Sequence, residues 1–341
     1  MKTGRLLKSM MLFFASFKKN ASKSLIPYFL LTACIISSCG DYAEYHNYDE
    51  LGFELADLAN LFPSVSRLST IGHTHENRAI WALKISDNVE TDEDEPVVYI
   101  DGGIHGNEWI AVEVALFTAK HLLENYESDN RIRNIVNGAE IWIVPMLNPD
   151  GHSALEIQSN PELASLQEIG RKNGLDNSEI NPGVDLNRNY DSNWGNEDDG
   201  TSHTPSSAYY CGEFPFSEPE ALAVKDFLDI HPPSASISYH CYGQYIAYAG
   251  GTDSNSIYLA ENMASLITGV NGVNYDFKHT YKSGGEKEWI YDTFSIPAFV
   301  VELRPTAIPP GYMLPAEEIQ ATVNENLSGS LFLMEWAIDN Y

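Results

Sequence analysis

His105 and Glu108 lie three residues apart, just after a run of β-branched and aromatic residues at 97–100. Glycines interrupt that run, and apolar residues at helical spacing occupy 110–126. The pair is therefore predicted to lie on the connection between the carboxyl end of a strand and a helix, where open α/β sheets bind their ligands. An imidazole and a carboxylate at this spacing can bind one zinc ion. Taken alone, the motif is equally compatible with an ordinary His/Glu pair on the surface.

Two other predicted strands carry residues that suit the same chemistry. His240 follows the apolar run 235–239, and Glu302 is the one carboxylate in the apolar run 297–303. His240 would complete a set of two imidazoles and one carboxylate, which leaves a coordination position open for water, as in catalytic zinc sites. A carboxylate in a buried strand needs a partner or a chemical role, so Glu302 is the candidate general base. In isolation, His240 could be a hydrogen-bonded core histidine and Glu302 a strand end that faces solvent.

The order of the predicted elements is typical of an α/β protein. Helical patterns occur at 49–61, 110–126, 217–230, 255–267 and 316–338. Strand patterns occur between them, at 78–85, 96–101, 140–146, 235–239, 244–248 and 297–303. This alternation predicts one domain over residues 45–341, with a mixed, mostly parallel β-sheet covered by helices on both faces. Ser217 and Glu220 are predicted to form a capping box at the start of a helix. Residues 151–210 show little periodicity, and the Asn-Pro-Asp-Gly sequence that ends at Gly151 is a turn signal.

The amino terminus has the pattern of a targeting signal. A basic segment precedes an apolar run at 25–36, and small residues lead to Cys39. This resembles a bacterial lipoprotein signal peptide over residues 1–38, after which Cys39 would be lipidated and residues 39–44 would form a short tether. Cys34 fits less well because it would truncate the apolar run. An uncleaved anchor is the other possibility, although the run is shorter than the ~20 residues that span a membrane. The predicted location is the bacterial cell envelope, in the periplasm or on the outer surface.

Charge is distributed unevenly along the chain. Six of the 20 basic residues, and none of the 48 acidic residues, precede Cys39. The remaining 14 basic and 48 acidic residues give a formal charge of −34. Such a surface repels nucleic acids, which excludes them as partners.

Cys211 and Cys241 follow Cys39, and an envelope location would permit a disulfide between them without requiring one.

The chemistry-bearing residues occur in the order and spacing of the zinc metallocarboxypeptidases of the funnelin family, which the chain resembles over residues 45–340. The matching residues are His105, Glu108, Asn148-Pro149-Asp150-Gly151, Arg171, Asn187, Arg188, His240, Tyr281 and Glu302. The resemblance implies the family's α/β fold and hydrolysis of the C-terminal peptide bond, with one Zn²⁺ held by the two histidines and Glu108. It implies a monomer that acts on peptide or protein C-termini. The catalytic domain would start a few residues after Cys39, which leaves no room for the amino-terminal propeptide of the secreted digestive relatives.

The resemblance also assigns roles around the metal. Asp185 would accept a hydrogen bond from His105, and Glu302 would act as general base. Arg171 would stabilise the oxyanion, although an arginine in an irregular segment could also be an ordinary basic residue.

Further residues would bind the substrate. Asn187 and Arg188 would bind the terminal carboxylate, and Tyr281 would close over it, on a segment made mobile by the glycines that follow.

Three further features of the chain bear on specificity and backbone geometry. Asn107 stands where many relatives have Arg, so subsites farther from the terminus should bind less tightly. The resemblance would place Lys287 on the floor of the pocket for the leaving side chain, where a cation would favour a C-terminal Glu or Asp. Lys287 could instead turn outward or be neutralised by Glu286 or Glu288. The resemblance also implies cis bonds at Cys241-Tyr242 and Arg304-Pro305, the second of which proline makes less costly.

Two other functions stay open. A peptidase that trims peptidoglycan stem peptides would use the same zinc site in the same compartment. A surface lipoprotein that binds peptides without cleaving them would be expected to lack a zinc ligand or the general base, and this sequence lacks neither.

Overall fold

The protein is described from a computed structural model, for residues 44–174, 183–269, 272–307 and 311–341. The predicted signal peptide, Cys39 and nearly all of the predicted tether lie outside these ranges. Across the described ranges, no helix is long and apolar enough to cross a membrane.

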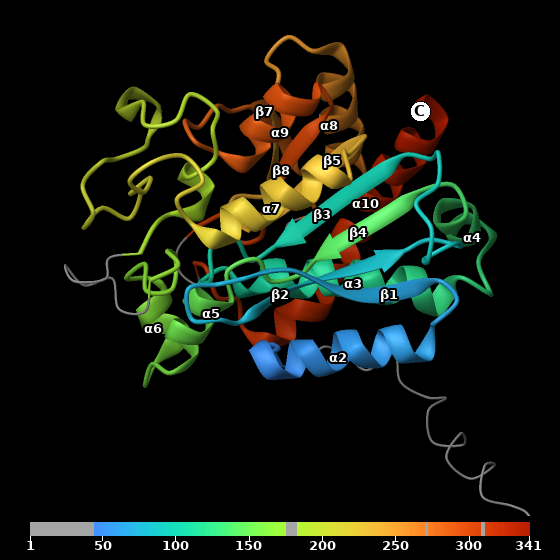
Figure 1. Ribbon diagram of the computed structural model, residues 1–341, viewed down its shortest axis with the longest axis horizontal. Helices are drawn as coiled ribbons and strands as arrows, with labels where there is room; N and C mark the ends of the chain where they lie inside the picture. Colours follow the sequence, from blue (N-terminus) through green and yellow to red (C-terminus); the bar gives the residue numbers. More distant parts are fainter. Residues whose placement is uncertain (1–43, 175–182, 270–271, 308–310) are drawn as a thin grey trace, which may run out of the picture. The chain divides into compact units, whose positions relative to one another are not determined.

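An eight-stranded mixed sheet forms the centre of the domain (Figure 1). Its strands are β1 (Ser66–His73), β2 (Ala79–Ile85), β3 (Val97–Gly102), β4 (Glu140–Val144), β5 (Ala235–Cys241), β6 (Tyr245–Tyr248), β7 (Asp276–His279) and β8 (Ala298–Leu303). They lie in the order β1-β2-β4-β3-β5-β8-β6-β7. The four central strands β4, β3, β5 and β8 are mutually parallel, as are β6 and β7, and the other neighbours are antiparallel. The predicted mixed, mostly parallel sheet is confirmed.

Helices cover both faces of this sheet (Figure 1). On one face lie α2 (Tyr48–Leu61), α3 (Trp109–Asn125), α4 (Asn130–Val136), α8 (Ser254–Leu266) and α10 (Ile319–Asn340). On the other lie α7 (Pro219–Ile230) and α9 (Glu286–Phe294). Alternate residues of β3 enter the two cores, Val98 and Ile100 on the first face and Tyr99 on the second. Such double burial explains why the central strands read as continuous apolar runs.

Most of the short helices occupy parts of the chain that show no periodicity, and one 3₁₀ turn lies at the start of the predicted helix 316–338. They are α5 (Pro149–Glu156), α6 (Pro161–Ser165) and the 3₁₀ turns η2 (Leu186–Arg188), η3 (Glu197–Asp199) and η4 (Ala316–Glu318). The expected turn at Asn148 is in fact the start of α5, because the Asn148 side chain accepts a hydrogen bond from the amide of Gly151 and Pro149 occupies the first turn.

The predicted capping box of α7 is wrong. The N-cap residue of α7 is Glu218, and no side chain caps it among the described residues. Ser217 instead contacts Asn189 and Glu218, and Glu220 accepts a hydrogen bond from Asn173. Both side chains are therefore engaged outside the helix.

The three strands that carry the chemistry-bearing residues are neighbours. β3 pairs with β5 and β5 with β8, all parallel, so their carboxyl ends lie at one edge of the sheet. In this register His240 lies directly opposite Glu302.

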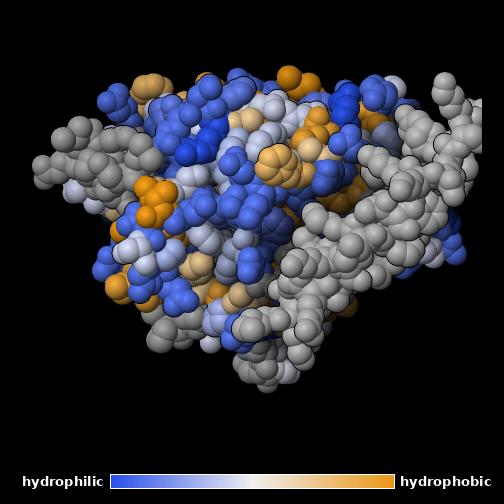
Figure 2. All heavy atoms as spheres, turned by 90° about the horizontal axis from the view of Figure 1, so that it is seen from below, coloured by the Kyte–Doolittle hydropathy of each residue, from blue (hydrophilic) through white to orange (hydrophobic). Residues whose placement is uncertain are grey.

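The face of the molecule shown in Figure 2 is mainly hydrophilic where it is not covered by grey atoms, and its apolar residues form separate small groups.

Candidate active site

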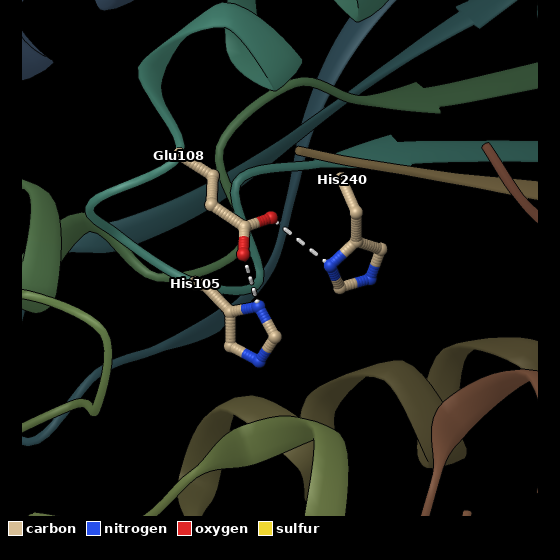
Figure 3. Close-up of side chains that lie close together, drawn as sticks. All are labelled: His105, Glu108 and His240. Carbon is tan, nitrogen blue, oxygen red and sulfur yellow. Dashed lines mark hydrogen bonds and ion pairs between the residues drawn. The ribbon is translucent and has the colours of Figure 1, made fainter. Parts of the chain in front are cut away.

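His105, Glu108 and His240 converge at the carboxyl edge of the sheet (Figure 3). The Nδ1 atoms of His105 and His240 lie 2.8 and 3.0 Å from the two carboxylate oxygens of Glu108. One ligand atom from each residue lies within 4.8 Å of the other two, and all three side chains are buried. Two imidazoles and a carboxylate in this arrangement form the donor set of a catalytic zinc site, so these residues fit Zn²⁺.

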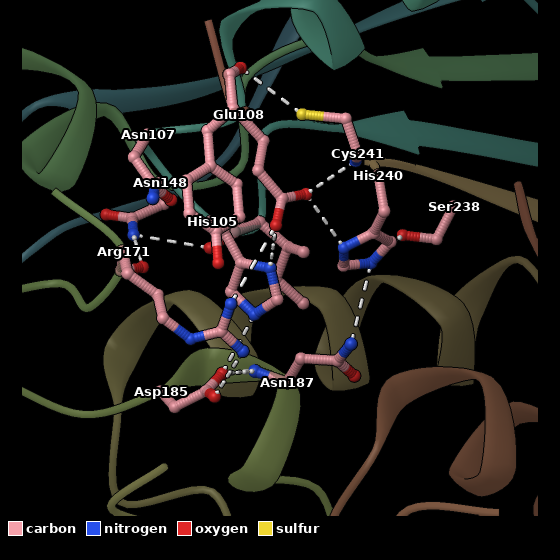
Figure 4. Close-up of polar contacts among 12 residues, drawn as sticks. His105, Asn107, Glu108, Asn148, Arg171, Asp185, Asn187, Ser238, His240 and Cys241 are labelled. Carbon is pink, nitrogen blue, oxygen red and sulfur yellow. Dashed lines mark hydrogen bonds and ion pairs between the residues drawn. The ribbon is translucent and has the colours of Figure 1, made fainter. Parts of the chain in front are cut away.

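The second nitrogen of each imidazole has its own partner (Figure 4). Nε2 of His105 lies 3.0 Å from Oδ1 of Asp185, as the resemblance implied. Nε2 of His240 lies 3.4 Å from Oγ of Ser238 and 3.5 Å from Nδ2 of Asn187. A proton held on Nε2 of His105 by Asp185 leaves Nδ1 free to bind a metal.

Asp185 is the centre of a buried ionic cluster. Its Oδ2 accepts a hydrogen bond of 2.8 Å from Nη2 of Arg171, and its Oδ1 accepts one from the amide of Asn187. Burial by itself would raise the pKa of Asp185, but Arg171 and His105 hold that pKa well below its usual range. Arg171 is itself buried, and its Nη1 lies 3.8 Å from Glu108. The structure thus places Arg171 in the site, not at an unrelated surface position.

Arg188 is positioned by the 3₁₀ turn η2. Its Nε donates to the carbonyl of Gly200 at 2.9 Å and its Nη1 to the carbonyl of Asn187 at 2.6 Å. The guanidinium carbons of Arg171 and Arg188 lie 5.3 and 5.5 Å from the centre of the Tyr209 ring. Two guanidinium groups therefore flank one aromatic ring beside the metal-binding residues.

Glu302 lies in β8, opposite His240 in β5 and opposite Tyr245 in β6. Burial raises the pKa of Glu302 to about 7 in the metal-free protein, although the neighbouring His240 works against that rise. Burial and the adjacent Glu302 also raise the pKa of Tyr245. A carboxyl group with a pKa close to neutrality can exchange a proton with water at physiological pH.

A cavity of about 680 Å³ joins these residues. Its lining includes the metal triad, Glu302, both arginines and Asn187, and it continues to Thr280, Lys287, Glu288 and Val300. Lys287 is only 3 % exposed, and its Nζ lies 3.0 Å from the carbonyl of Thr280 and 2.5 Å from Oε1 of Glu288. Lys287 therefore does not turn outward, but Glu288 balances part of its charge. Glu286 makes other contacts, with Tyr190 and Asn187.

Three residues with expected roles at the site, Asp185, Tyr281 and Asn107, do not line this cavity. Tyr281 is 38 % exposed, and its hydroxyl lies 3.4 Å from Oγ of Ser192. Its neighbours Thr280 and Lys282 do line the cavity. Asn107 is fully buried, with its amide directed to the carbonyl of Ser165. The Asn107 side chain therefore does not reach the cavity, and the weaker binding at subsites farther from the terminus stays a prediction.

Two peptide bonds near the site are cis, and both cysteines of the described chain are free. The bonds Cys241-Tyr242 and Arg304-Pro305 are both cis, as predicted. Within the described residues Cys211 and Cys241 are free thiols, so the disulfide left open by the sequence is not formed. The thiol of Cys241 lies 3.3 Å from the carbonyl of Tyr312.

Sequence reasoning missed several cavity residues, chiefly Tyr209, Tyr245, Lys278 and Lys282. Tyr245 had a usable signal, since it starts the strand predicted after His240. Nζ of Lys278 lies 3.4 Å from the centre of the Tyr245 ring, a contact between residues of the neighbouring strands β6 and β7. Tyr209 belongs to the long irregular segment, where no periodic pattern indicates which side chains point inward.

Comparison with known proteins agrees with this geometry. The family model for zinc carboxypeptidases matches residues 54–329. Rat carboxypeptidase A2 (Rattus norvegicus) is 31 % identical over 314 residues, which cover 88 % of this chain and 72 % of the relative. Bovine carboxypeptidase O (Bos taurus) is 29 % identical over 315 residues, which cover 88 % of this chain and 80 % of the relative.

The solved structure of thrombin-activatable fibrinolysis inhibitor superposes with a TM-score of 0.78 and 26 % identity, over 89 % of this chain and 77 % of that one. The residues matched by the family model, 54–329, run from α2 to α10 and span the positions of the metal triad. The protein therefore belongs to the zinc carboxypeptidase family and is a zinc-dependent metallopeptidase.

Proposed function

We propose that the protein removes acidic residues, Glu or Asp, from the C-termini of peptides. The observation that carries this proposal is the buried Lys287 in the wall of the active-site cavity, close to the sites for the metal and the terminal carboxylate. A cation there attracts a carboxylate side chain and rejects Lys or Arg at the same position.

The residues around the cavity support exopeptidase chemistry. Arg188 and Asn187 both line the cavity, and Arg188 would bind the terminal carboxylate, because a planar guanidinium binds a carboxylate through two parallel hydrogen bonds. Arg171 would stabilise the negative charge that develops on the scissile carbonyl oxygen. Glu302 would take a proton from the attacking water and pass it to the leaving amine as the peptide bond breaks. When bound, Zn²⁺ polarises the carbonyl and lowers the pKa of water.

The charge of the cavity differs from that of the chain. Its lining holds five cationic side chains, Arg171, Arg188, Lys278, Lys282 and Lys287, and three carboxylates, Glu108, Glu288 and Glu302. The sequence after Cys39 carries 14 basic and 48 acidic residues. A local excess of positive charge in an acidic molecule focuses the field on the cavity and attracts anionic substrates.

The ion pair with Glu288 leaves Lys287 able to bind a ligand. The ammonium has three N–H donors, of which Thr280 and Glu288 take two. A substrate carboxylate can accept the third. Glu288 therefore weakens the acidic preference without abolishing it.

The test compares kcat/KM for blocked dipeptides that differ only in a C-terminal Glu, Phe or Arg. Wild type should prefer Glu, because one added charge-assisted hydrogen bond is worth about 1.5–3 kcal/mol, or about 10- to 100-fold. Lys287→Met should lose this preference and still cleave the Phe substrate. Lys287→Asp should shift the preference toward Arg, and Glu288→Gln should strengthen the preference for Glu.

Lys282→Met is the matched control, because Lys282 lines the same cavity but is exposed to solvent. It should change the Glu/Phe ratio by less than about fivefold, as expected for an exposed charge. A wild type that prefers Phe or Arg, or a Lys287→Met variant with an unchanged ratio, would refute the acidic specificity. Selective cleavage of peptidoglycan stem peptides would support the other peptidase function instead.

We propose that Tyr281 reaches the cavity only when substrate is bound. Support comes from its position beside two lining residues and just before Gly284 and Gly285. The glycines would allow the segment to move.

We also propose that the protein is a lipoprotein of the bacterial cell envelope, anchored through Cys39. The support is the sequence pattern of residues 1–38. Labelled palmitate should be incorporated into the wild type and not into Cys39→Ala, and the variant should leave the membrane fraction. Equal labelling of both proteins would contradict the assignment.

A further inference from the structure

A second cluster of potential metal ligands lies at the amino-terminal end of α7, with its own residues. Nε2 of His75, on the turn between β1 and β2, lies 2.9 Å from Oε2 of Glu218. The carboxylate of Glu220 completes the group, so that one ligand atom from each of the three residues lies within 4.8 Å of the others. Glu220 is the residue that was expected to form a capping box with Ser217 and does not, and Glu218 is the N-cap residue of α7.

The hydrogen bonds of this cluster are incomplete. Nδ2 of Asn173 donates to Oε2 of Glu218 at 2.7 Å and to Oε2 of Glu220 at 3.0 Å. Glu220 is 0 % exposed, yet its Oε1 has no hydrogen-bond partner among the described residues. A buried carboxylate oxygen without a partner is costly. A proton or a cation bound to Oε1 of Glu220 would remove this cost.

The amide of Asn173 cannot rotate to help. Its Oδ1 accepts a hydrogen bond of 2.7 Å from the amide of Val184, which fixes the NH₂ group toward the two carboxylates. An ion would have to use the remaining lone pairs of Glu218 and Glu220, together with Nε2 of His75. A cavity of about 510 Å³, lined by His75, Asn173 and Glu218, adjoins the cluster and gives access from solvent.

We propose that His75, Glu218 and Glu220 bind a second divalent transition-metal ion, for which Zn²⁺ is the probe. One imidazole and two carboxylates form a donor set that suits Zn²⁺, with water from the cavity in the remaining positions. Ca²⁺ is a poorer match, because it takes oxygen ligands and has little use for the imidazole. A dication would also balance the two glutamate charges.

This ion would link three separate segments next to the active site. His75 belongs to the β1–β2 turn, and the two glutamates belong to the start of α7. Asn173 donates hydrogen bonds to both glutamates and accepts one from the amide of Val184. By fixing the glutamates, the ion would therefore also fix Asn173, which lies two residues after Arg171, and Val184, which precedes Asp185. Its effect would therefore be to stabilise the two described segments that carry Arg171 and Asp185.

The proposal predicts a difference in metal content between matched histidine variants of the full chain. After equilibrium dialysis against Zn²⁺, plasma mass spectrometry should find one ion fewer per chain in His75→Ala than in wild type. His73→Ala, which removes an exposed histidine two residues away, should bind as many ions as wild type. Any zinc held elsewhere by this acidic protein contributes equally to all three measurements.

A second measurement follows the stability of the zinc-loaded enzyme. Added Zn²⁺ at about 100 times its Kd should raise Tm by roughly 3–6 °C in wild type and His73→Ala, and leave His75→Ala unchanged. Glu220→Gln keeps the shape of the side chain and should also lose the additional ion. Equal zinc content in wild type, His75→Ala and Glu220→Gln would overturn the proposal and indicate that Glu220 is simply protonated.

Discussion

At the scale of single residues, the most informative position is Glu302, a carboxylate in an otherwise apolar strand. Its neighbours across the sheet are His240, one of the three metal-binding residues, and Tyr245. Its own pKa of about 7 in the metal-free protein results mainly from burial. These surroundings suit a group that must both accept and donate a proton during one turnover.

We therefore expect Glu302→Gln to lower kcat by about 10²- to 10⁴-fold, the usual contribution of a general base. The amide keeps the shape of the side chain but cannot take up the proton. Zinc content, measured by plasma mass spectrometry, should equal that of the wild type, because Glu302 is not one of the three metal-binding residues. A variant with full kcat, or one that loses zinc, would show that Glu302 has a different role.

The sequence located the zinc triad only through the order and spacing of several motifs together, because His105, Glu108 and His240 each have an ordinary structural explanation when taken alone. It left open whether Glu286 or Glu288 neutralises Lys287. Adjacent residues on a helix normally point in different directions, so helical spacing did not indicate that Lys287 and Glu288 meet at the first turn of α9. The position of Tyr281 was missed for a related reason, since its side-chain direction depends on a contact with the distant Ser192.

At the scale of elements, the start of α9 is held against the turn η2 by a close backbone approach. Gly284 has φ +72°, and a Cβ atom there would lie 2.1 Å from the carbonyl oxygen of Arg188. The segment that carries Lys287 and the turn that carries Arg188 therefore depend on a glycine for their relative position. Any side chain at 284 must push the two apart.

We predict that Gly284→Ala raises KM for peptide substrates by at least about tenfold while the metal triad stays intact. Gly272→Ala is the matched control, because Gly272 has φ +71° and nothing lies within 4 Å of the added atom. Both variants lose about 1–2 kcal/mol of stability from the left-handed backbone, and only Gly284→Ala also displaces Arg188. Equal KM values for the two variants would contradict the role of this approach.

Elements were predicted where burial produces a regular pattern and missed where it does not. The central strands β3, β4, β5 and β8 follow from continuous apolar runs. The edge strand β1 was missed because most of its residues are half-buried, without alternation. Helix α5 was missed because Asn-Pro-Asp-Gly was interpreted as a turn, although Asn before Pro is also a common way to begin a helix.

At the scale of the whole molecule, overall and local charge have opposite signs. The chain beyond Cys39 has a formal charge of −34, and the active-site cavity is lined by more cations than carboxylates. Salt screens both the repulsion among surface acids and the attraction of the cavity for an acidic substrate. The two consequences can be measured separately.

Raising NaCl from about 0.02 to about 0.5 M should increase Tm by a few degrees and also increase KM for a substrate ending in Glu. KM for a substrate ending in Phe should rise less, since only the common terminal carboxylate is affected. Calorimetry and steady-state kinetics on the zinc-loaded enzyme provide the measurement. A fall in Tm, or equal changes in the two KM values, would argue against this distribution of charge.

The pairing of β3, β5 and β8 also determines when activity can first arise during synthesis. His105 and Glu108 follow β3 and leave the ribosome early, His240 follows much later, and Glu302 comes near the end of the chain. Pairing between such distant segments is slow, and β5 cannot pair with β8 before β8 has emerged. The nascent chain therefore has no complete catalytic centre until synthesis is almost finished. Because the residues of the site are spread along the chain, proteolytic activity arises only late in synthesis.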